Sequence, residues 1–229
     1  MVKQERARRT RERALDAAAQ EFAAHGYAHT TVNAVAARLG MTKGALYGHF
    51  ASKDELAEAI LQYGDAAWQR ILASPPAERG PAVPGRPPVG EPLAPLGTVT
   101  LALARGLADD VRFRAAYRLA ADALLAGERE GRLLLDIQSH MSRLVGVAQE
   151  AGAVALRCSS TVIAEVLLAL VAAVRSATLA AAGVDAVAWL EAVWGAVGGV
   201  LADGRLPEEL LEGHRPAVVP PNGAVTEAG

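Results

Sequence analysis

The sequence predicts an all-α protein with a small N-terminal helical domain and a larger C-terminal helical bundle. Three observations lead to this prediction. Hydrophobic residues make up 52% of the 229 residues, and alanine is abundant whereas alternating β-branched and aromatic residues, which favour strands, are scarce. Apolar residues recur at the i, i+3, i+4, i+7 spacing of a helix face. Glycines and capping residues stand where such helices would end and begin.

Four helices are expected before residue 74. Apolar stripes predict the first, second and fourth of them, over residues 15–22, 32–39 and 56–63. The third helix, about residues 43–50, is short and directs Leu46 and Phe50 inward. Residues 1–53 are therefore expected to form one helical domain, and residues 54–73 a helix that connects it to the rest of the chain.

Capping residues mark the ends of these helices. Gly26 and Gly40 follow the first two stripes, where a left-handed residue commonly closes a helix. Thr30 or Thr31 can cap the second helix, and Thr42 can cap the third. The fourth helix opens on a capping box, Ser-Lys-Asp-Glu at 52–55, which places two carboxylates at its positive end.

The second half of the chain is expected to be helical again after a proline-rich connector. Residues 74–97 hold eight of the twelve prolines, which predicts a disordered loop there. Further helices are expected at about 98–108, 110–126, 130–151, 159–182 and 185–202. Residues 98–206 would form the C-terminal domain and residues 207–229 a disordered tail. The last two helices are apolar nearly all round, so they must be buried inside the domain or against a second copy.

Charge is unevenly distributed along the chain, although the net charge is only −2. Residues 1–53 carry nine Lys/Arg and four Asp/Glu, whereas residues 54–229 carry 14 and 21. A basic head on an acidic body indicates contact with a polyanion, the alternative being an arginine-rich solvated N-terminus. The same two interpretations, a contact in a DNA groove or a solvated helix start, remain open for residues 3–13.

Several classes of protein are not expected from this sequence. No apolar run approaches the roughly 20 residues that span a bilayer, and the N-terminus lacks the apolar region of a signal peptide. The single cysteine, Cys158, cannot form a disulfide within the chain and is expected in the core. The sequence contains no metal-spaced His/Cys cluster and no HExxH, P-loop or GxSxG motif. We therefore expect a cytoplasmic protein that is not an enzyme and holds no cofactor or metal.

The stretch "TKGALYGHF", residues 42–50, suits a surface that meets DNA. Leu-Gly-Met-Thr at 39–42 joins the second and third helices into a helix-turn-helix, whose second helix enters the major groove. Lys43 can bind guanine O6 and N7, and Gly44 lets the duplex approach closely. The remaining polar groups can bind backbone phosphates: Thr42, Tyr47, His49 and Lys53. A purely structural role for His49 is an equal alternative.

The segment "GYAHTTVNAVAARLGMTKGALYGHFASKDEL", residues 26–56, resembles the DNA-binding signature of the TetR family of transcriptional repressors. The likeness covers about residues 8–65. The combination of "TKGALYGHF" with the later "FRAAYRLA" is most similar to γ-butyrolactone receptors of actinobacteria. The resemblance implies a homodimer that binds a palindromic operator until a small molecule enters the C-terminal domain. It also implies a set of DNA contacts: Thr31, Thr42, Lys43, Gly44, Tyr47, His49 and Lys53.

The chain departs from the family pattern at two places. Gly48 stands where the family usually has an aromatic or bulky residue, which predicts a loose recognition helix because glycine disfavours helix by about 1 kcal/mol. The stretch "LLLDIQSH", residues 133–140, lacks the pocket tryptophan typical of the lactone receptors. The effector could therefore be an antibiotic or another secondary metabolite. A pseudo-receptor that binds DNA without a lactone remains the alternative.

An effector pocket is expected between the helices of the C-terminal domain, lined by apolar groups with a few polar ones. Its candidate lining residues, each of which could instead be ordinary core, are Trp68, Phe113, Tyr117, Ile137, Met141, Leu144, Glu165, Leu168 and Thr178. Glu165 is a carboxylate in an apolar stretch and needs a partner, either the effector or an arginine. The last two long helices, about 159–202, are the expected dimer face, with Trp189 and Trp194 anchoring either that face or the core.

Overall fold

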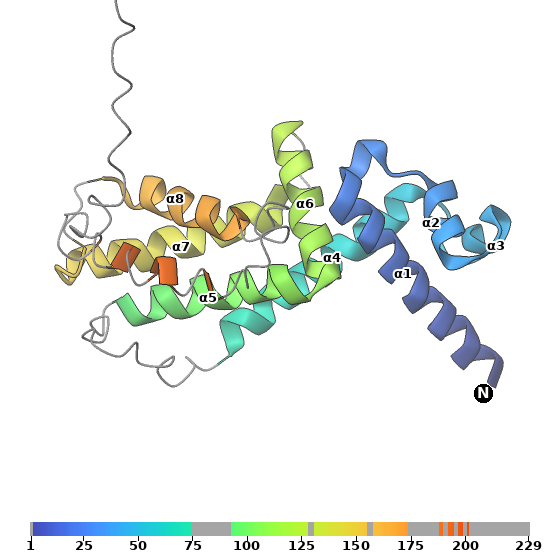
Figure 1. The fold of residues 1–229 in the computed structure, drawn as a ribbon, viewed down its shortest axis with the longest axis horizontal. Coiled ribbons are helices and arrows are strands. Elements are labelled where there is room, and N and C mark those ends of the chain that lie inside the picture. The colour runs from blue at the N-terminus through green and yellow to red at the C-terminus, as the bar shows by residue number, and fades with distance from the viewer. Residues whose placement is uncertain are drawn as a thin grey trace, which may run out of the picture.

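The computed structural model describes residues 2–74, 93–127, 131–154 and 158–173, together with short stretches between 188 and 201. The described residues contain no strand, which confirms the all-α prediction. Their helices are α1 (Val2–His29), α2 (Val32–Leu39), α3 (Lys43–Tyr47), α4 (Lys53–Ala73), α5 (Ala94–Asp109), α6 (Val111–Leu125), α7 (Arg132–Glu150) and α8 (Ser160–Ala173). α1–α3 form a head at one end, and α4 runs from it into a body that contains α5, α7 and α8 (Figure 1).

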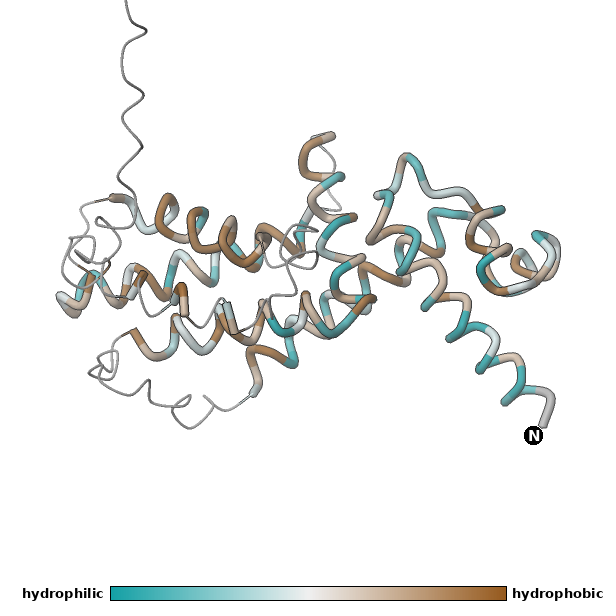
Figure 2. The backbone as a smooth tube through the Cα atoms, in the orientation of Figure 1, coloured by the Kyte–Doolittle hydropathy of each residue, from teal (hydrophilic) through white to brown (hydrophobic). Residues whose placement is uncertain are grey.

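The head is held together by a small apolar core. Leu46 of α3 is completely buried, and Phe50 is 1% exposed, as the sequence predicts. They pack in one cluster with Phe22 of α1 and Val35 of α2. The Arg38 guanidinium also binds the buried Glu21 carboxylate at 2.7 Å, which fixes α2 against α1. Along the backbone tube, teal and pale residues are frequent at this end of the molecule, whereas brown residues concentrate in the body (Figure 2).

The helix ends agree with most of the predicted caps. Thr31, rather than Thr30, caps α2, and its Oγ1 accepts the Ala34 N–H at 3.1 Å. Gly40 adopts the left-handed conformation, with φ 64° and ψ 32°. Gly26 also has a positive φ of 72°, but its ψ of −179° lies outside the left-handed helical region. It therefore forms a kink within α1 and not the predicted left-handed C-cap. Residues beyond Gly26 are helical as far as His29.

The capping box at the start of α4 is displaced by one residue from its ideal form. Ser52 Oγ accepts the Glu55 N–H at 3.1 Å, as predicted. The Glu55 carboxylate reaches back to the Ala51 N–H at 2.6 Å, one residue before the cap. Both partners stabilise the first turn of α4, which lies directly after α3 in the chain.

Two predicted boundaries were wrong. The expected third helix over 43–50 ends at Tyr47, and Gly48 forms its C-cap. The connector expected to reach residue 97 ends earlier, because α5 begins at Ala94 with a proline in its first turn, where the missing N–H costs nothing. Residues 75–92, most of the Pro-rich segment, lie outside the described residues, as do 174–187 and the predicted tail beyond 206.

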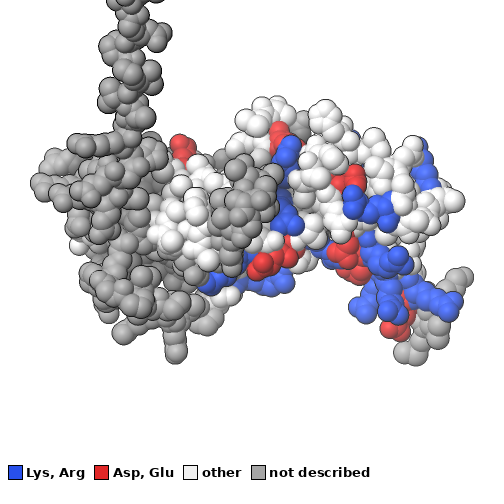
Figure 3. Space-filling view, viewed as in Figure 1, with Lys and Arg blue, Asp and Glu red and all other residues white. Residues whose placement is uncertain are grey.

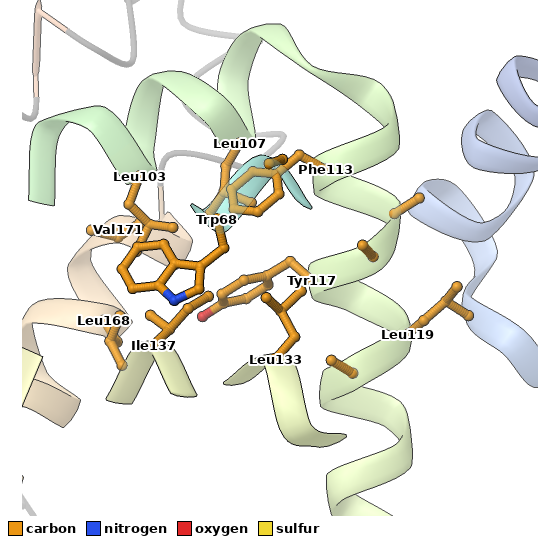
Figure 4. Packing of buried hydrophobic residues seen from close by; sticks show 14 of the residues in the cluster. Trp68, Leu103, Leu107, Phe113, Tyr117, Leu119, Leu133, Ile137, Leu168 and Val171 are labelled. Atoms are coloured by element: carbon orange, nitrogen blue, oxygen red, sulfur yellow. The ribbon is translucent and has the colours of Figure 1, made fainter. Parts of the chain in front are cut away.

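The body is built around a closely packed aromatic and aliphatic cluster. Trp68 of α4 lies among Leu103 and Leu107 of α5, with Phe113 and Tyr117 of α6 beside it (Figure 4). Trp194 is 8% exposed and so belongs to the core; a methyl group added to Gly97 would lie 2.7 Å from its ring nitrogen. Trp189 is half-buried. Cys158 is exposed, so the expectation of a core cysteine was wrong.

α6 joins the head to the body by contacts at both of its ends. Near its start, Arg112 binds Asp16 at 2.7 Å and Glu12 at 2.8 Å, both on α1. Burial alone would lower the pKa of Arg112, but the hydrogen bonds from these two carboxylates raise it, so the guanidinium stays charged. Farther along, the Asp122 carboxylate accepts the Tyr27 N–H at 3.2 Å.

The middle of α6 packs closely against α4 at Gly64. A methyl group on Gly64 of α4 would lie 2.4 Å from the Ala116 Cβ of α6. Only a residue without a side chain therefore allows this approach. In the described part of the chain, no helix has the length and apolarity needed to cross a membrane.

Candidate nucleic-acid interface

α3 is anchored on one face and open on the other. Leu46 is its buried residue, whereas Lys43, Gly44 and Tyr47 are exposed, Tyr47 to 42%. The Lys43 Nζ lies 5.6 Å from the centre of the Tyr47 ring, so the cation and the phenol share one surface. Lys43 makes no ion pair with any described residue. The helix thus presents a free cation, a hydroxyl and a bare backbone together.

Gly44 is exposed for a reason that packing does not explain. A methyl group added there would meet no atom within 4 Å. Its backbone is helical, so glycine is not needed for conformation either. Glycine weakens a helix by about 1 kcal/mol relative to alanine. Neither packing nor backbone conformation in the described protein therefore requires glycine at position 44.

Thr31 and Thr42 hold the starts of the two helices of the motif. Thr42 Oγ1 accepts the Ala45 N–H at 3.2 Å, and Thr31 does the same for Ala34. Accepting that bond leaves each hydroxyl hydrogen available as a donor. Both threonines are exposed, so the two hydroxyls can donate to a phosphate while they cap their helices.

His49 and Lys53 are more closely tied to the protein than the other predicted contacts. The His49 carbonyl accepts Arg11 Nη1 at 2.6 Å, and the residue is half-buried. Lys53 Nζ donates to the Tyr27 carbonyl at 3.0 Å and lies 4.0 Å from the centre of the Tyr27 ring. An ammonium group has three donors, so Lys53 retains capacity for a phosphate. The Tyr27 hydroxyl in turn binds the Asp54 carboxylate.

Arg11 is a positioning residue that sequence reasoning missed. Besides its bond to His49, its guanidinium lies 3.9 Å above the Phe50 ring and pairs with Glu55 at 3.6 Å. It therefore links α1 to the end of α3 and the start of α4. The signal was present in the sequence, because residue 11 precedes Leu15, Ala18 and Phe22 by four, seven and eleven positions. A cation on the apolar face of a helix indicates an inward-facing guanidinium.

Positive charge gathers at the same end of the molecule. Lys and Arg side chains form a dense group on the N-terminal part of α1, and further cations lie on the adjoining head (Figure 3). The body shows fewer of them on this face. A positive surface around an exposed helix raises the local concentration of a polyanion and speeds its binding.

Gly40 and Gly48 allow a paired stability prediction for this segment. Gly48 has φ −68°, which alanine adopts freely, and an added methyl would meet only the Ala45 carbonyl oxygen at 3.3 Å. We expect Gly48→Ala to stabilise the protein by about 0.4–1 kcal/mol. Gly40→Ala should instead destabilise it by about 1–2 kcal/mol, because its φ is +64°.

Urea unfolding of the two variants measures both changes. Gly40 is the matched control, since the residues lie in one motif and an added methyl at Gly40 meets nothing within 4 Å. Equal effects of the two substitutions would contradict the conformations assigned to these glycines.

Most residues predicted to line an effector pocket lie in the packed core of the body. Trp68, Ile137 and Met141 are at most 2% exposed, and Phe113, Tyr117 and Leu168 are also buried. Leu144 is half-buried against the same cluster. The structure brings these residues together in one hydrophobic cluster, and Figure 4 shows Trp68, Phe113 and Tyr117 packed side by side between the helices.

Two predicted pocket residues do not join this cluster. Glu165 is exposed, and its partner among the described residues is the Gln138 amide, whose N–H its carboxylate accepts at 2.8 Å, rather than an arginine. It occupies the outward face of α8 with the exposed Val162 and Val166. Thr178 lies outside the described residues.

A shallow hollow of ≈ 240 Å³ lies instead between the end of α4, α5 and the start of α6. Its lining includes Arg70, Ser74 and Asp110 with Ile71 and Phe113. Only Phe113 belongs to the predicted set. Within the described residues, no group of three or more His, Cys, Asp or Glu side chains could hold a metal ion.

Comparison with known proteins finds a family match that lies in the head and the start of α4. The family profile described as "Bacterial regulatory proteins, tetR family" matches residues 14–60, which include the end of α1, all of α2 and α3, and the first turns of α4. The A-factor receptor protein of Streptomyces griseus is 46% identical over 61 residues, which are 27% of this chain and 22% of that protein. This alignment thus covers about a fifth of the relative's length.

Solved structures extend the likeness to the body. A γ-butyrolactone receptor (ArpA-like protein) is 27% identical with a TM-score of 0.57, over 81% of this chain and 98% of the other. The TetR family protein CprB of Streptomyces coelicolor, solved in complex with its biological operator sequence, is also 27% identical. Its TM-score is 0.52, over 69% of this chain and 74% of that protein.

Proposed function

From the premise that this chain is a TetR family transcriptional regulator, we propose that it represses transcription as a homodimer on a palindromic operator. Each α3 enters a major groove, with Lys43 at a guanine and Tyr47 on the backbone. Thr31, Thr42 and Gly44 complete the first contacts, and His49 and Lys53 bind flanking phosphates. The last two long helices, about 159–202, form the interface between the copies.

One observation carries this proposal. A capped five-residue helix is pinned by Leu46 while Lys43 and Tyr47 project into solvent beside it. Apart from the contact of the Lys43 ammonium with the Tyr47 ring, neither side chain has a partner among the described residues. The operator complex of the similar protein CprB supports the same role for the equivalent surface here. Dimer formation is supported by Val162 and Val166, which leave an apolar face of α8 exposed at 49% and 56%.

Lys43→Ala tests the direct readout of a base. We expect specific binding to weaken by about 1–3 kcal/mol, since the bidentate bonds to one guanine are removed. The operator is first selected by the wild-type protein from random-sequence duplexes, and affinity is then measured by gel-shift titration. Lys53→Ala is the matched control, because removal of a phosphate-binding group weakens binding to all sequences alike. Unchanged affinity of the Lys43 variant would remove this residue from the readout.

We further propose that a small molecule releases the protein from its operator, a γ-butyrolactone-like signal or another secondary metabolite. Similarity to γ-butyrolactone receptors supports this. A pseudo-receptor that binds DNA without a lactone is the second candidate, and the filled core around Trp68 favours it. Thermal-shift screening against lactones and antibiotics, scored by operator release, separates the two. Release by a stabilising compound supports a receptor, and stabilisation by none supports the pseudo-receptor.

A further inference from the structure

We propose that the first turns of α1 form a second DNA-binding surface, in which Arg6, Arg9 and Arg13 bind phosphates beside the groove that α3 occupies. We call residues 4–13 the basic arm. This inference rests on the proposed function and extends the contact with DNA from α3 to the helix that opens the chain.

The first part of the basic arm packs against almost nothing. Residues 4–9 are all exposed, and the first buried residue of α1 is Ala14. In Figure 1 this half of α1 projects from the head at the end where α3 also lies. The arm is thus the unpacked start of the 28-residue α1, and the fold of the head does not need its exposed side chains.

The arm carries more positive than negative charge. Arg6, Arg9 and Arg13 are three and four residues apart, so they lie on one face and repel one another. None of the three forms an ion pair with a described residue, and the nearby Glu12 carboxylate is bound to Arg112 at 2.8 Å. Phosphates would relieve this repulsion.

Arg11 places the arm relative to the recognition helix. It lies within the same stretch of α1 and holds the His49 carbonyl at 2.6 Å and the Phe50 ring at 3.9 Å. Arg11 therefore ties the C-terminal end of the arm to the residues that follow α3. Arg6 and Arg13 are about 10 Å apart along the axis, about the rise of three nucleotides of one strand. This fixed position beside a groove-binding helix favours duplex DNA over a membrane or an acidic protein.

The test is the salt dependence of DNA affinity for the full-length double variant Arg6→Gln/Arg9→Gln. The probes are the selected operator and a random-sequence duplex of equal length. We expect the slope of log affinity against log salt to fall by about 0.9 for each phosphate that is no longer neutralised, on both probes. The ratio of the two affinities should stay unchanged, because phosphate contacts carry no sequence information. Arg6→Lys/Arg9→Lys should keep the wild-type slope.

Arg132→Gln/Arg143→Gln is the matched control, since it removes two exposed arginines of α7 in the body. Circular dichroism confirms that each variant is folded. A slope for the arm variant equal to that of the control would overturn the inference and identify the arm as a solvated helix start. The proposed function fails separately, if the wild-type protein shows no preference for any selected sequence over random DNA.

Discussion

Leu46→Ala should destabilise the protein by about 2–5 kcal/mol and abolish operator binding. Leu46 is completely buried, so its truncation loses the transfer energy of the side chain and leaves a cavity in the head. α3 has only five residues and cannot persist without its packing. The residues that would meet DNA then lose their fixed arrangement, although none of them is changed. Urea unfolding and gel-shift titration measure the two effects.

The matched control is Leu125→Ala, at a leucine of α6 that is 88% exposed. The same chemical change there should alter the free energy of unfolding by less than about 0.5 kcal/mol and leave DNA binding unchanged. If the two variants were equally stable, Leu46 would not be the anchor of α3.

Trp68→Ala should lower the free energy of unfolding by about 3–5 kcal/mol, because it leaves a cavity at the centre of the body. The Trp68 ring is 2% exposed and packs edge-to-face on His140, with ring centres 5.6 Å apart. Burial, with a smaller contribution from Arg143, lowers the pKa of His140, so the imidazole beside the indole is neutral at neutral pH. Thermal and urea unfolding measure the loss.

Free indole gives this prediction a second readout. An apolar void of this kind stays dry and binds an apolar guest, so indole should raise the melting temperature of Trp68→Ala and leave that of the wild type unchanged. A Trp68→Ala variant as stable as the wild type would instead mean that the indole borders a space already open to a ligand, which would favour the receptor over the pseudo-receptor.

The parts of the protein that follow local rules could be predicted from the sequence. Thr42, Gly40 and Ser52 act at helix ends through hydrogen bonds to neighbours in the chain, so their roles are fixed by spacing alone. Leu46 is likewise buried by the period of a helix. The surface position of Lys43 and Tyr47 follows from the same period.

Features that depend on contacts between distant residues were not predictable in the same way. The pairing of Arg112 with Glu12 and Asp16 joins residues about 100 positions apart, and no local pattern indicates it. The apolar neighbours of Glu165 in the sequence made it a candidate for the pocket lining, but its side chain is exposed. Its place on α8 is set by which face of that helix meets α7, and the sequence of α8, apolar nearly all round, leaves that choice open.

The unbroken course of α4 has a mechanical consequence. This single helix begins beside α3 and carries Trp68 into the body. At Gly64 it packs closely against α6, so this contact is the point about which α4 can tilt. The rise along the helix axis from Gly64 back to Ser52 is about 18 Å, so a tilt of about 5° about Gly64 moves that end by about 1.6 Å. In the proposed homodimer the two shifts add. A disturbance no larger than one side chain would thus displace both α3 helices from the major grooves of the proposed operator.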